Sequence, residues 1–506
     1  MANRSVRTKK NILSGFINKL ITLFLPFLIR TIIIKKLGAE YLGLSSLFTS
    51  ILQVLNMAEL GFSSAIVFSL YKPMAEKNTA EICALLHYYK NIYKVVGIVI
   101  SVVGCILIPF LPNLINGSYP SDIDLYVLYI IFLANTSVSY FAFAYKSVLL
   151  TADQHQNIIS NIDTILCILR YGIQIAMLII ISNYYAYIIW NLIFTVANNI
   201  IVAVITNNKY PEYICKGEIS KDKKNEITKQ IKGLAIGKVS LVARNSLDSI
   251  VLSMFCGLVD VAIYSNYYYI YSAIGGFLSV IVAALTGSVG NSIATESVEK
   301  NYYDCQRFSF FFSGIFSVCT VCLFGLYQPF MKIWVGEQYV ASGTVMILFC
   351  VYFYISQIGQ IRGIYASAAG IWWEFRWAEL CEMLGNLLLN FLLGYFWGMK
   401  GILIATIITV TIFSLIWITD VTFKEYFKRN TVDYWKDNAI YFVMTYVAIF
   451  IVWHLFKYVR TTGIVDLFVR LLICVATGIG VYGILIMISG KYRRYFISVV
   501  ENTLKR

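Results

Sequence analysis

Blocks of about twenty consecutive apolar residues recur along almost the whole chain. An α-helix rises 1.5 Å per residue, so a helix of about twenty residues crosses the roughly 30 Å hydrocarbon core of a bilayer. The composition agrees, because 59% of the 506 residues are hydrophobic and only 13% are charged. A water-soluble fold could not bury that much apolar surface. The sequence therefore predicts an all-α, polytopic membrane protein.

The pattern within the blocks favours helices over barrel strands. The runs Val95 to Phe110 and Ile402 to Ile418 do not alternate between apolar and polar residues, as strands of a membrane barrel would. We expect about 14 transmembrane helices on this basis. They are placed near residues 11–34, 41–70, 92–112, 124–150, 158–182, 187–206, 233–256, 261–290, 307–331, 341–369, 379–397, 401–419, 437–456 and 464–488.

The distribution of lysine and arginine predicts the orientation. With the N-terminus inside, most basic loop residues fall on the cytoplasmic side, where such loops are retained, and both termini are then cytoplasmic. The first apolar run is too long for the core of a cleaved signal, so it is expected to remain as a helix. The only long connector, 207–232, is lysine-rich and reads as a cytoplasmic linker between two halves. This predicts an N-lobe at 1–206, the linker at 207–232, a C-lobe at 233–419, and two further helices with a tail at 420–506.

Several function classes are disfavoured. The net charge of +14 is spread over the predicted cytoplasmic loops, which fits topology and anionic lipid better than nucleic acid. The eleven cysteines are scattered, and the pair Cys319 and Cys322 sits in an apolar run. Neither a disulfide framework nor a metal site is expected. The chain contains no GxxxxGK[ST] motif, and no cofactor is predicted.

Charged residues inside the predicted spans are the functional candidates, because burying them in lipid is costly and they tend to face a bundle interior or a wet cavity. The candidates for a cationic substrate-binding lumen are Lys19, Arg30, Lys146, Arg170, Lys238, Arg244 and Arg362. Those near helix ends have an alternative role, since long side chains there reach the headgroups. The deeper ones could instead be partners that hold helices together.

Acidic and amide residues form a second set, in which several members recur at helical spacing. The candidates for ion coupling or for the polar lumen are Glu59, Asp163, Asp248, Glu379, Glu382 and Asn386. Arg244 and Asp248 are four residues apart and able to pair on one helix surface. A basic, water-accessible cavity suits an anion, because an arginine fork binds phosphate through two charge-assisted hydrogen bonds. The residues therefore favour a phosphate-bearing substrate.

Four short segments resemble one family of transporters. They are Lys10-Asn11, Leu37-Gly38 continuing to Tyr41-Leu42-Gly43-Leu44, then Leu60-Gly61-Phe62-Ser63-Ser64-Ala65, and the turn from Gly257 to Tyr264. They are similar to the Wzx-type polysaccharide flippases of the multidrug/oligosaccharidyl-lipid/polysaccharide exporter superfamily. The resemblance extends over most of the chain and is strongest in the first 75 residues and in 233–290.

The resemblance implies two six-helix lobes around a cationic central cavity, with two additional helices at the C-terminus. It also implies alternating access that moves an undecaprenyl-pyrophosphate-linked sugar repeat across the bacterial inner membrane, for capsule, O-antigen or a similar polymer. The expected partners are that lipid-linked oligosaccharide, membrane lipids, and the polymerase and assembly proteins of the pathway. One chain supplies both lobes, so a monomer suffices, and no enzymatic activity is implied.

Two alternatives from other classes remain. A membrane glycosyltransferase or polymerase could use Asp122 and Asp124 as a carboxylate pair, although an aspartate at a helix start is also an ordinary cap. The predicted outer loops are short for an external active site. The other alternative is a cation-coupled multidrug exporter of the same superfamily, and the basic rather than acidic stripes argue against it.

Overall fold

A computed structural model describes residues 2–59, 61–459 and 463–504. Within these ranges the chain is helical and contains no β-strand. Its internal contacts divide it into two units, unit 1 at residues 1–262 and unit 2 at residues 263–506. The predicted all-α, polytopic class is confirmed. The division into lobes and a linker at 207–232 stays a prediction.

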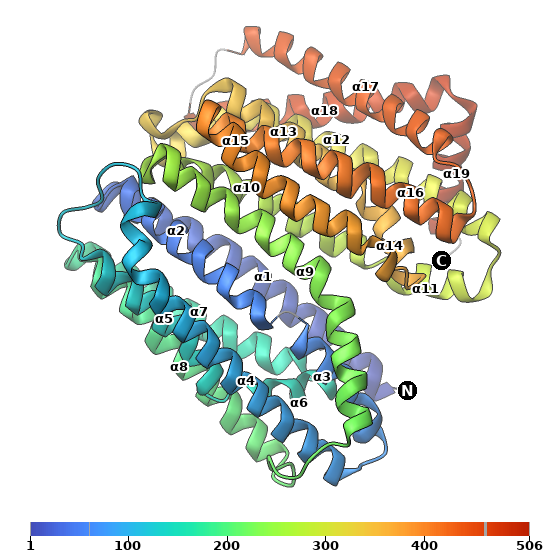
Figure 1. Cartoon of the computed structure of the whole chain (residues 1–506). Coiled ribbons are helices and arrows are strands. Elements are labelled where there is room, and N and C mark those ends of the chain that lie inside the picture. Colours follow the sequence, from blue (N-terminus) through green and yellow to red (C-terminus); the bar gives the residue numbers. More distant parts are fainter. Residues whose placement is uncertain (1, 60, 460–462, 505–506) are drawn as a thin grey trace. The chain divides into compact units, whose positions relative to one another are not determined.

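Unit 1 is built from helices that run from the N-terminus to the start of α10 (Figure 1). Its elements are α1 (Ala2–Lys36), α2 (Ala39–Leu55), η1 (Asn56–Glu59), α3 (Phe62–Ala75), α4 (Thr79–Leu107), η2 (Ile108–Leu114), α5 (Leu125–Phe141), η3 (Ala144–Lys146), α6 (Ser147–Ala152), α7 (Gln156–Ile180), α8 (Tyr184–Lys209) and α9 (Lys221–Cys256).

Two spans predicted as continuous helices in unit 1 are interrupted. The span placed at 41–70 is split into α2 and α3 by η1 and by Gly61, whose φ of 100° is a conformation that favours glycine. The span placed at 124–150 bends by 46° between α5 and the segment 144–152, where Phe143 has a φ of 63°. A non-glycine residue rarely adopts that conformation, so the residue types alone did not predict the second break.

The end of α9 is tied to the loop that precedes α5. Asn116 donates its backbone N–H to the Ser253 carbonyl at 2.9 Å and its side-chain amide to the Phe255 carbonyl at 2.7 Å. The last carbonyls of a helix have no hydrogen-bond donor within the helix, so these bonds supply donors to carbonyls that would otherwise lack one. Within unit 1, α9 packs along α2.

Unit 2 contains the remaining helices. They are α10 (Leu258–Ala283), which starts in unit 1, α11 (Thr286–Thr295), α12 (Val298–Val335), η4 (Glu337–Tyr339), α13 (Gly343–Ile358), α14 (Gln360–Ala368), η5 (Trp373–Phe375), α15 (Arg376–Thr409), the π-helical turn η6 (Val410–Trp417), α16 (Ile418–Thr422), a second π-helical turn η7 (Phe423–Phe427), α17 (Val432–Leu455), η8 (Phe456–Tyr458), α18 (Gly463–Ile488) and α19 (Gly490–Leu504).

The predicted spans at 379–397 and 401–419 belong to one helical segment, Trp373–Phe427, of 55 residues. A straight helix of that length would be about 80 Å long, far more than a bilayer needs. The segment instead kinks at Gly398, where φ is 55° and ψ is −134°. Exposed tryptophans at 377 and 397 flank its first half, as expected for side chains at two membrane interfaces. The segment therefore suits two crossings.

Eleven helical segments of the described chain are long and apolar enough to cross a membrane, or up to twelve when the bent pair after α4 counts as one span. The short apolar helix α2 and the second half of the kinked segment add to that number. The result agrees with the predicted number of about 14 transmembrane helices.

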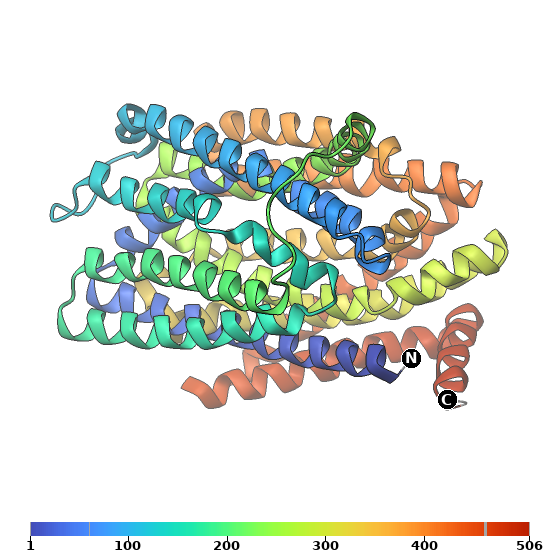
Figure 2. The same ribbon diagram turned by 90° about the horizontal axis from the view of Figure 1, so that it is seen from below.

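Helix α19 departs from the direction of the long helices in unit 2. In both views it runs across α17 and α18 near one end of those helices (Figures 1 and 2). It packs against α18 and α12. Helix α19 therefore lies crosswise to the long apolar helices of its own unit.

Candidate functional site

A polar cavity of about 310 Å³ lies inside unit 1, among α1, α5, α7 and α8. Its lining residues are mostly hydroxyl, amide and charged side chains, although the helices that carry them are apolar overall. They are Asn18, Thr22, Ser139, Asp163, Leu166, Cys167, Arg170, Phe194, Thr195, Asn198 and Asn199. Polar groups gathered in the interior of a membrane bundle are functional candidates by default.

Hydrogen bonds between helices hold the wall of this cavity. Asn18 on α1 donates to the Ser160 carbonyl at 3.2 Å and to the Thr164 hydroxyl at 3.1 Å, both on α7. Thr195 on α8 donates to the Asn135 side chain on α5 at 2.8 Å. Such bonds are common between membrane helices and are worth about 0.6 kcal/mol each on average. The cavity is therefore bordered by tied helices rather than by loops.

Arg170 and Asp163 bring opposite charges to the cavity from a single helix. They lie seven residues apart, two turns along α7, and so on one face. The Arg170 guanidinium carbon lies 4.7 Å from the centre of the Tyr171 ring. Its Nε is buried and has no hydrogen-bond partner among the described residues, and the same is true of Asn198 Oδ1 and Asn199 Nδ2. Unpartnered buried polar atoms call for an explanation, and a polar occupant of the cavity supplies one.

The other basic candidates of unit 1 are not among the lining residues of this cavity. Lys19 is exposed on α1, and Arg30 is half-buried. Lys146 donates to the Asn207 side chain at the end of α8, and Lys238 donates to the Ser64 hydroxyl at 3.1 Å. Among the predicted basic residues, only Arg170 lines the polar cavity in the described part of the chain. Substrate-binding roles for the others stay predictions.

Helix α9 carries the predicted pair Arg244 and Asp248. Asp248 is buried with 2% of its surface exposed, and Arg244 is half-buried. Two residues away, Ser246 donates to the Gln53 side chain on α2 at 3.1 Å. The α9 and α2 surfaces therefore share polar as well as apolar contacts, and the pairing of Arg244 with Asp248 stays a prediction.

Glu59 sits at the interruption between α2 and α3. Its carboxylate accepts hydrogen bonds from Tyr93 on α4 at 2.6 Å and from Tyr140 on α5 at 2.8 Å. Tyr140 also donates to Asn56 at 3.2 Å. These bonds tie η1 to two neighbouring helices at the point where the helical backbone hydrogen bonds of α2 end. A structural role accounts for this geometry, and a coupling role for Glu59 stays a prediction.

Arg362 is the most buried of the predicted cations. It is 5% exposed, and its Nη1 donates to the Ser414 carbonyl in η6 at 3.2 Å. In a π-helical turn some carbonyls lack the usual partner, so an arginine can satisfy one of them. This bond is contained within unit 2, and a lumen role for Arg362 stays a prediction.

The acidic and amide stripe of α15 points into unit 2. Glu379 is half-buried, Glu382 is 6% exposed, and Asn386 is fully buried. Asn386 donates to the hydroxyls of Thr406 at 3.1 Å and Thr409 at 3.3 Å. These threonines follow the kink at Gly398, so the amide joins the two halves of the kinked segment.

Replacing Asn386 with leucine should destabilise the protein by about 1–2 kcal/mol, because it removes the hydrogen bonds across the kink. The neighbouring polar groups would then lack these partners in an apolar interior. Unfolding of the purified protein in detergent, followed by its fluorescence, would measure the change. Leu388→Asn, at an exposed site on the same helix, controls for swapping the two residue types. An unaltered unfolding midpoint in Asn386→Leu would show that the amide does not brace the kink.

The carboxylates considered for a glycosyltransferase have structural partners. Asp124 accepts hydrogen bonds from the backbone N–H groups of Tyr126 at 2.9 Å and Val127 at 3.0 Å, so it is the N-cap of α5. Asp122 accepts a hydrogen bond from the Tyr41 hydroxyl. The expectation of a helix cap is confirmed for Asp124.

The sequence alone did not single out most of the amide and hydroxyl side chains of the polar cavity. Thr195, Asn198 and Asn199 recur at helical spacing within α8, and that pattern could have revealed them. As for metals, the described residues hold no group of three or more histidine, cysteine, aspartate and glutamate side chains placed to bind an ion.

Solved structures define the class of fold. The chain is similar to the lipid II flippase MurJ in an inward closed conformation, with a TM-score of 0.66, 16% identity, and coverage of 98% of this chain and 99% of MurJ. It is also similar to an inward-facing multidrug resistance MATE family transporter of the MOP superfamily, with a TM-score of 0.59, 13% identity, and coverage of 79% and 93%. The chain therefore shares the polytopic, all-α fold of these two proteins.

The family follows from the sequence itself. The model of the family described as polysaccharide biosynthesis protein matches residues 8–286, more than half of the chain. The chain belongs to this family, which confirms the resemblance to the polysaccharide flippases. No curated protein sequence matches the chain significantly. The family description connects the chain with polysaccharide biosynthesis, and the solved structures show the fold that it shares.

Proposed function

We propose that this protein flips an undecaprenyl-pyrophosphate-linked oligosaccharide repeat from the inner to the outer leaflet of the bacterial inner membrane, for a surface polysaccharide. Alternating access is the proposed mechanism, and both termini lie in the cytoplasm. The observation that carries the proposal is the position of Arg170, a cation with an unpartnered Nε in a polar cavity among apolar helices.

The chemistry of the cavity fits part of such a substrate. A guanidinium in a low-dielectric site forms strong, charge-assisted hydrogen bonds to phosphate oxygens, and amides and hydroxyls suit sugar hydroxyls. The cavity measures about 310 Å³, near the lower end of the roughly 300–1,000 Å³ range of small-molecule sites. It has room for a diphosphate or a sugar unit, and the remainder of the repeat and the lipid tail must lie outside it.

The membrane potential can supply driving force for this movement. Roughly 2.3 kcal/mol accompanies each elementary charge per 100 mV. An inside-negative potential therefore favours outward movement of an anionic headgroup. In this scheme a coupling ion is compatible with transport but is not required, and Asp163 is the predicted coupling residue that lines the same cavity as Arg170.

The test uses cells that lack their own surface-polymer flippase. Expression of this protein should restore surface polymer and lower the inner-leaflet pool of lipid-linked precursor, whereas an empty vector should do neither. An unchanged precursor pool with an altered polymer linkage would instead identify a glycosyltransferase or polymerase. Acquired resistance to cationic drugs without polymer would identify a multidrug exporter.

A further inference from the structure

An apolar groove of about 480 Å³ lies in unit 2, among α12, α18 and α19. It is separate from the polar cavity, which belongs to unit 1. Three glycines contribute to its lining, Gly314 on α12 with Gly478 and Gly483 on α18. A Cβ at Gly483 would meet open space, whereas a Cβ at Gly314 would lie 3.2 Å from Tyr482 and one at Gly478 would lie 2.9 Å from Val318. The last two glycines therefore let α12 and α18 pack closely, and Gly483 leaves the groove open. The proposed function makes no use of this groove.

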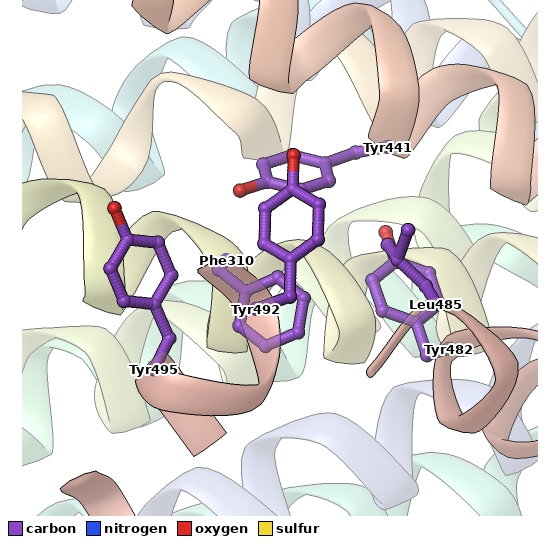
Figure 3. Close-up of a cluster of buried hydrophobic side chains, with 6 residues drawn as sticks. All are labelled: Phe310, Tyr441, Tyr482, Leu485, Tyr492 and Tyr495. Carbon is purple, nitrogen blue, oxygen red and sulfur yellow. The ribbon is translucent and has the colours of Figure 1, made fainter. Parts of the chain in front are cut away.

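A rigid aromatic cluster backs the groove. Phe310 and Tyr482 line it and also belong to a buried cluster with Tyr441, Leu485, Tyr492 and Tyr495 (Figure 3). Phe310 stacks on Tyr492 with 4.9 Å between the ring centres. Well-packed aromatic rings lose little further freedom when an apolar ligand binds against them. The groove is therefore preformed by the packing of unit 2.

A buried carboxylate fixes α19 at the end of this groove. Asp437 on α17 is 6% exposed and accepts hydrogen bonds from Lys491 Nζ at 2.7 and 2.8 Å and from the Tyr492 hydroxyl at 2.9 Å. One turn further along α19, Tyr495 donates to the Gln306 side chain on α12 at 3.0 Å. These bonds hold one face of α19 against unit 2 and leave the opposite face outside.

The outer face of α19 combines a cation with apolar side chains. Arg493 is exposed, as are Phe496 and Ile497, which follow it by three and four residues and so share its face. Phe496 lines the groove. Arg493 donates to the carbonyl of Met487, the neighbour of the groove residue Ile486. A guanidinium with five N–H donors is thus anchored beside one end of the apolar groove.

We propose that this groove and Arg493 form a binding site for an anionic glycerophospholipid. One acyl chain lies in the groove, and the phosphate of the headgroup is hydrogen-bonded by Arg493. The pairing of a cation with an apolar channel matches the two ends of such a lipid. The groove is flanked by exposed apolar side chains, Phe311 at 42% and Ile479 at 62%, so it opens toward surrounding lipid. This proposal does not depend on the identity of the transported substrate.

The experiment measures lipid retained by the full-length protein, purified in detergent, by native mass spectrometry. The probes are dioleoyl phosphatidylglycerol and dioleoyl phosphatidylcholine, which have the same chains and different net charge. We expect wild type to retain the anionic lipid preferentially. Arg493→Gln should lower its retention about fivefold, to the level of the zwitterionic lipid, because one basic contact at the membrane surface is lost.

The groove has its own variant and a matched control. No atom lies within 4 Å of a Cβ placed on Gly483 or on Gly480, so both positions on α18 accept a larger residue. Only Gly483 lines the groove. Gly483→Leu should reduce retention of both lipids, and Gly480→Leu should change neither.

Three outcomes would overturn the proposal. The first is equal retention of the two lipids by wild type, and the second is wild-type retention by Gly483→Leu. The third is displacement of phosphatidylglycerol by equimolar undecaprenyl diphosphate, which would assign the groove to an isoprenoid tail. None of these results bears on whether the protein restores surface polymer, so the proposed function is tested separately.

Discussion

Arg170→Ala should lower the outward movement of lipid-linked precursor at least about tenfold. A hydrogen bond to a charged group contributes about 1.5–3 kcal/mol, and each 1.4 kcal/mol is a factor of ten. Arg170 is the predicted cation that lines the polar cavity of unit 1. In flippase-deficient cells that carry this variant, surface polymer should fall and inner-leaflet precursor should accumulate, at membrane abundance equal to that of wild type.

Two further variants test whether the effect is specific to the guanidinium of Arg170. Arg170→Lys keeps the charge but loses the planar fork, so its activity should be intermediate. Lys36→Ala removes an exposed cation at the end of α1, a position that was not predicted to bind substrate, and should behave like wild type. If Arg170→Ala exports precursor normally while Arg244→Ala does not, the substrate phosphate is bound from α9, and the polar cavity has another use.

Gly43→Ala should strongly destabilise the protein, with a loss of about 3 kcal/mol or more in the free energy of unfolding. A Cβ at this position would lie 2.0 Å from the Leu258 carbonyl oxygen and 2.7 Å from its carbon. Both are backbone atoms that cannot rotate away, so α2 and the start of α10 would have to separate. The yield of monodisperse protein and its midpoint of thermal unfolding should both fall.

Gly172→Ala is the matched control for that experiment. Gly172 lies in α7, and no atom lies within 4 Å of the position that an alanine methyl group would take, so alanine fits without a clash. Alanine also favours a helix interior over glycine by about 0.5–1 kcal/mol. The control should therefore be as stable as wild type or slightly more so. Equal behaviour of the two variants would show that α2 and α10 are not in close contact at Gly43.

The positions of the membrane helices could largely be predicted from the sequence, because each helix needs its own apolar stretch of sufficient length. The break inside the span placed at 124–150 could not. At Phe143 the positive φ is a feature of the folded backbone, and no glycine or proline marks it. The kink at Gly398, in contrast, falls between the spans predicted at 379–397 and 401–419.

The candidate site could also be predicted only in part. Helical spacing placed Asp163 and Arg170 on one face of α7. It could not show that α1 would bring Asn18 and that α8 would bring Asn198 to the same cavity, because those residues lie on separate helices far apart in the sequence. Arg362 met the same sequence criterion as Arg170, yet it is bonded to the Ser414 carbonyl in unit 2.

The sequence by itself determined that this protein is a bundle of membrane helices with charges that need polar surroundings. Apolar length and the cost of burying charge are properties of single segments, and they hold whichever helices become neighbours. The tertiary structure alone decided which charges enter the polar cavity, which brace helices and how Asp437 holds α19. Those outcomes depend on which helix faces meet. Contacts between segments far apart in the chain produce no periodic pattern in the sequence of either segment.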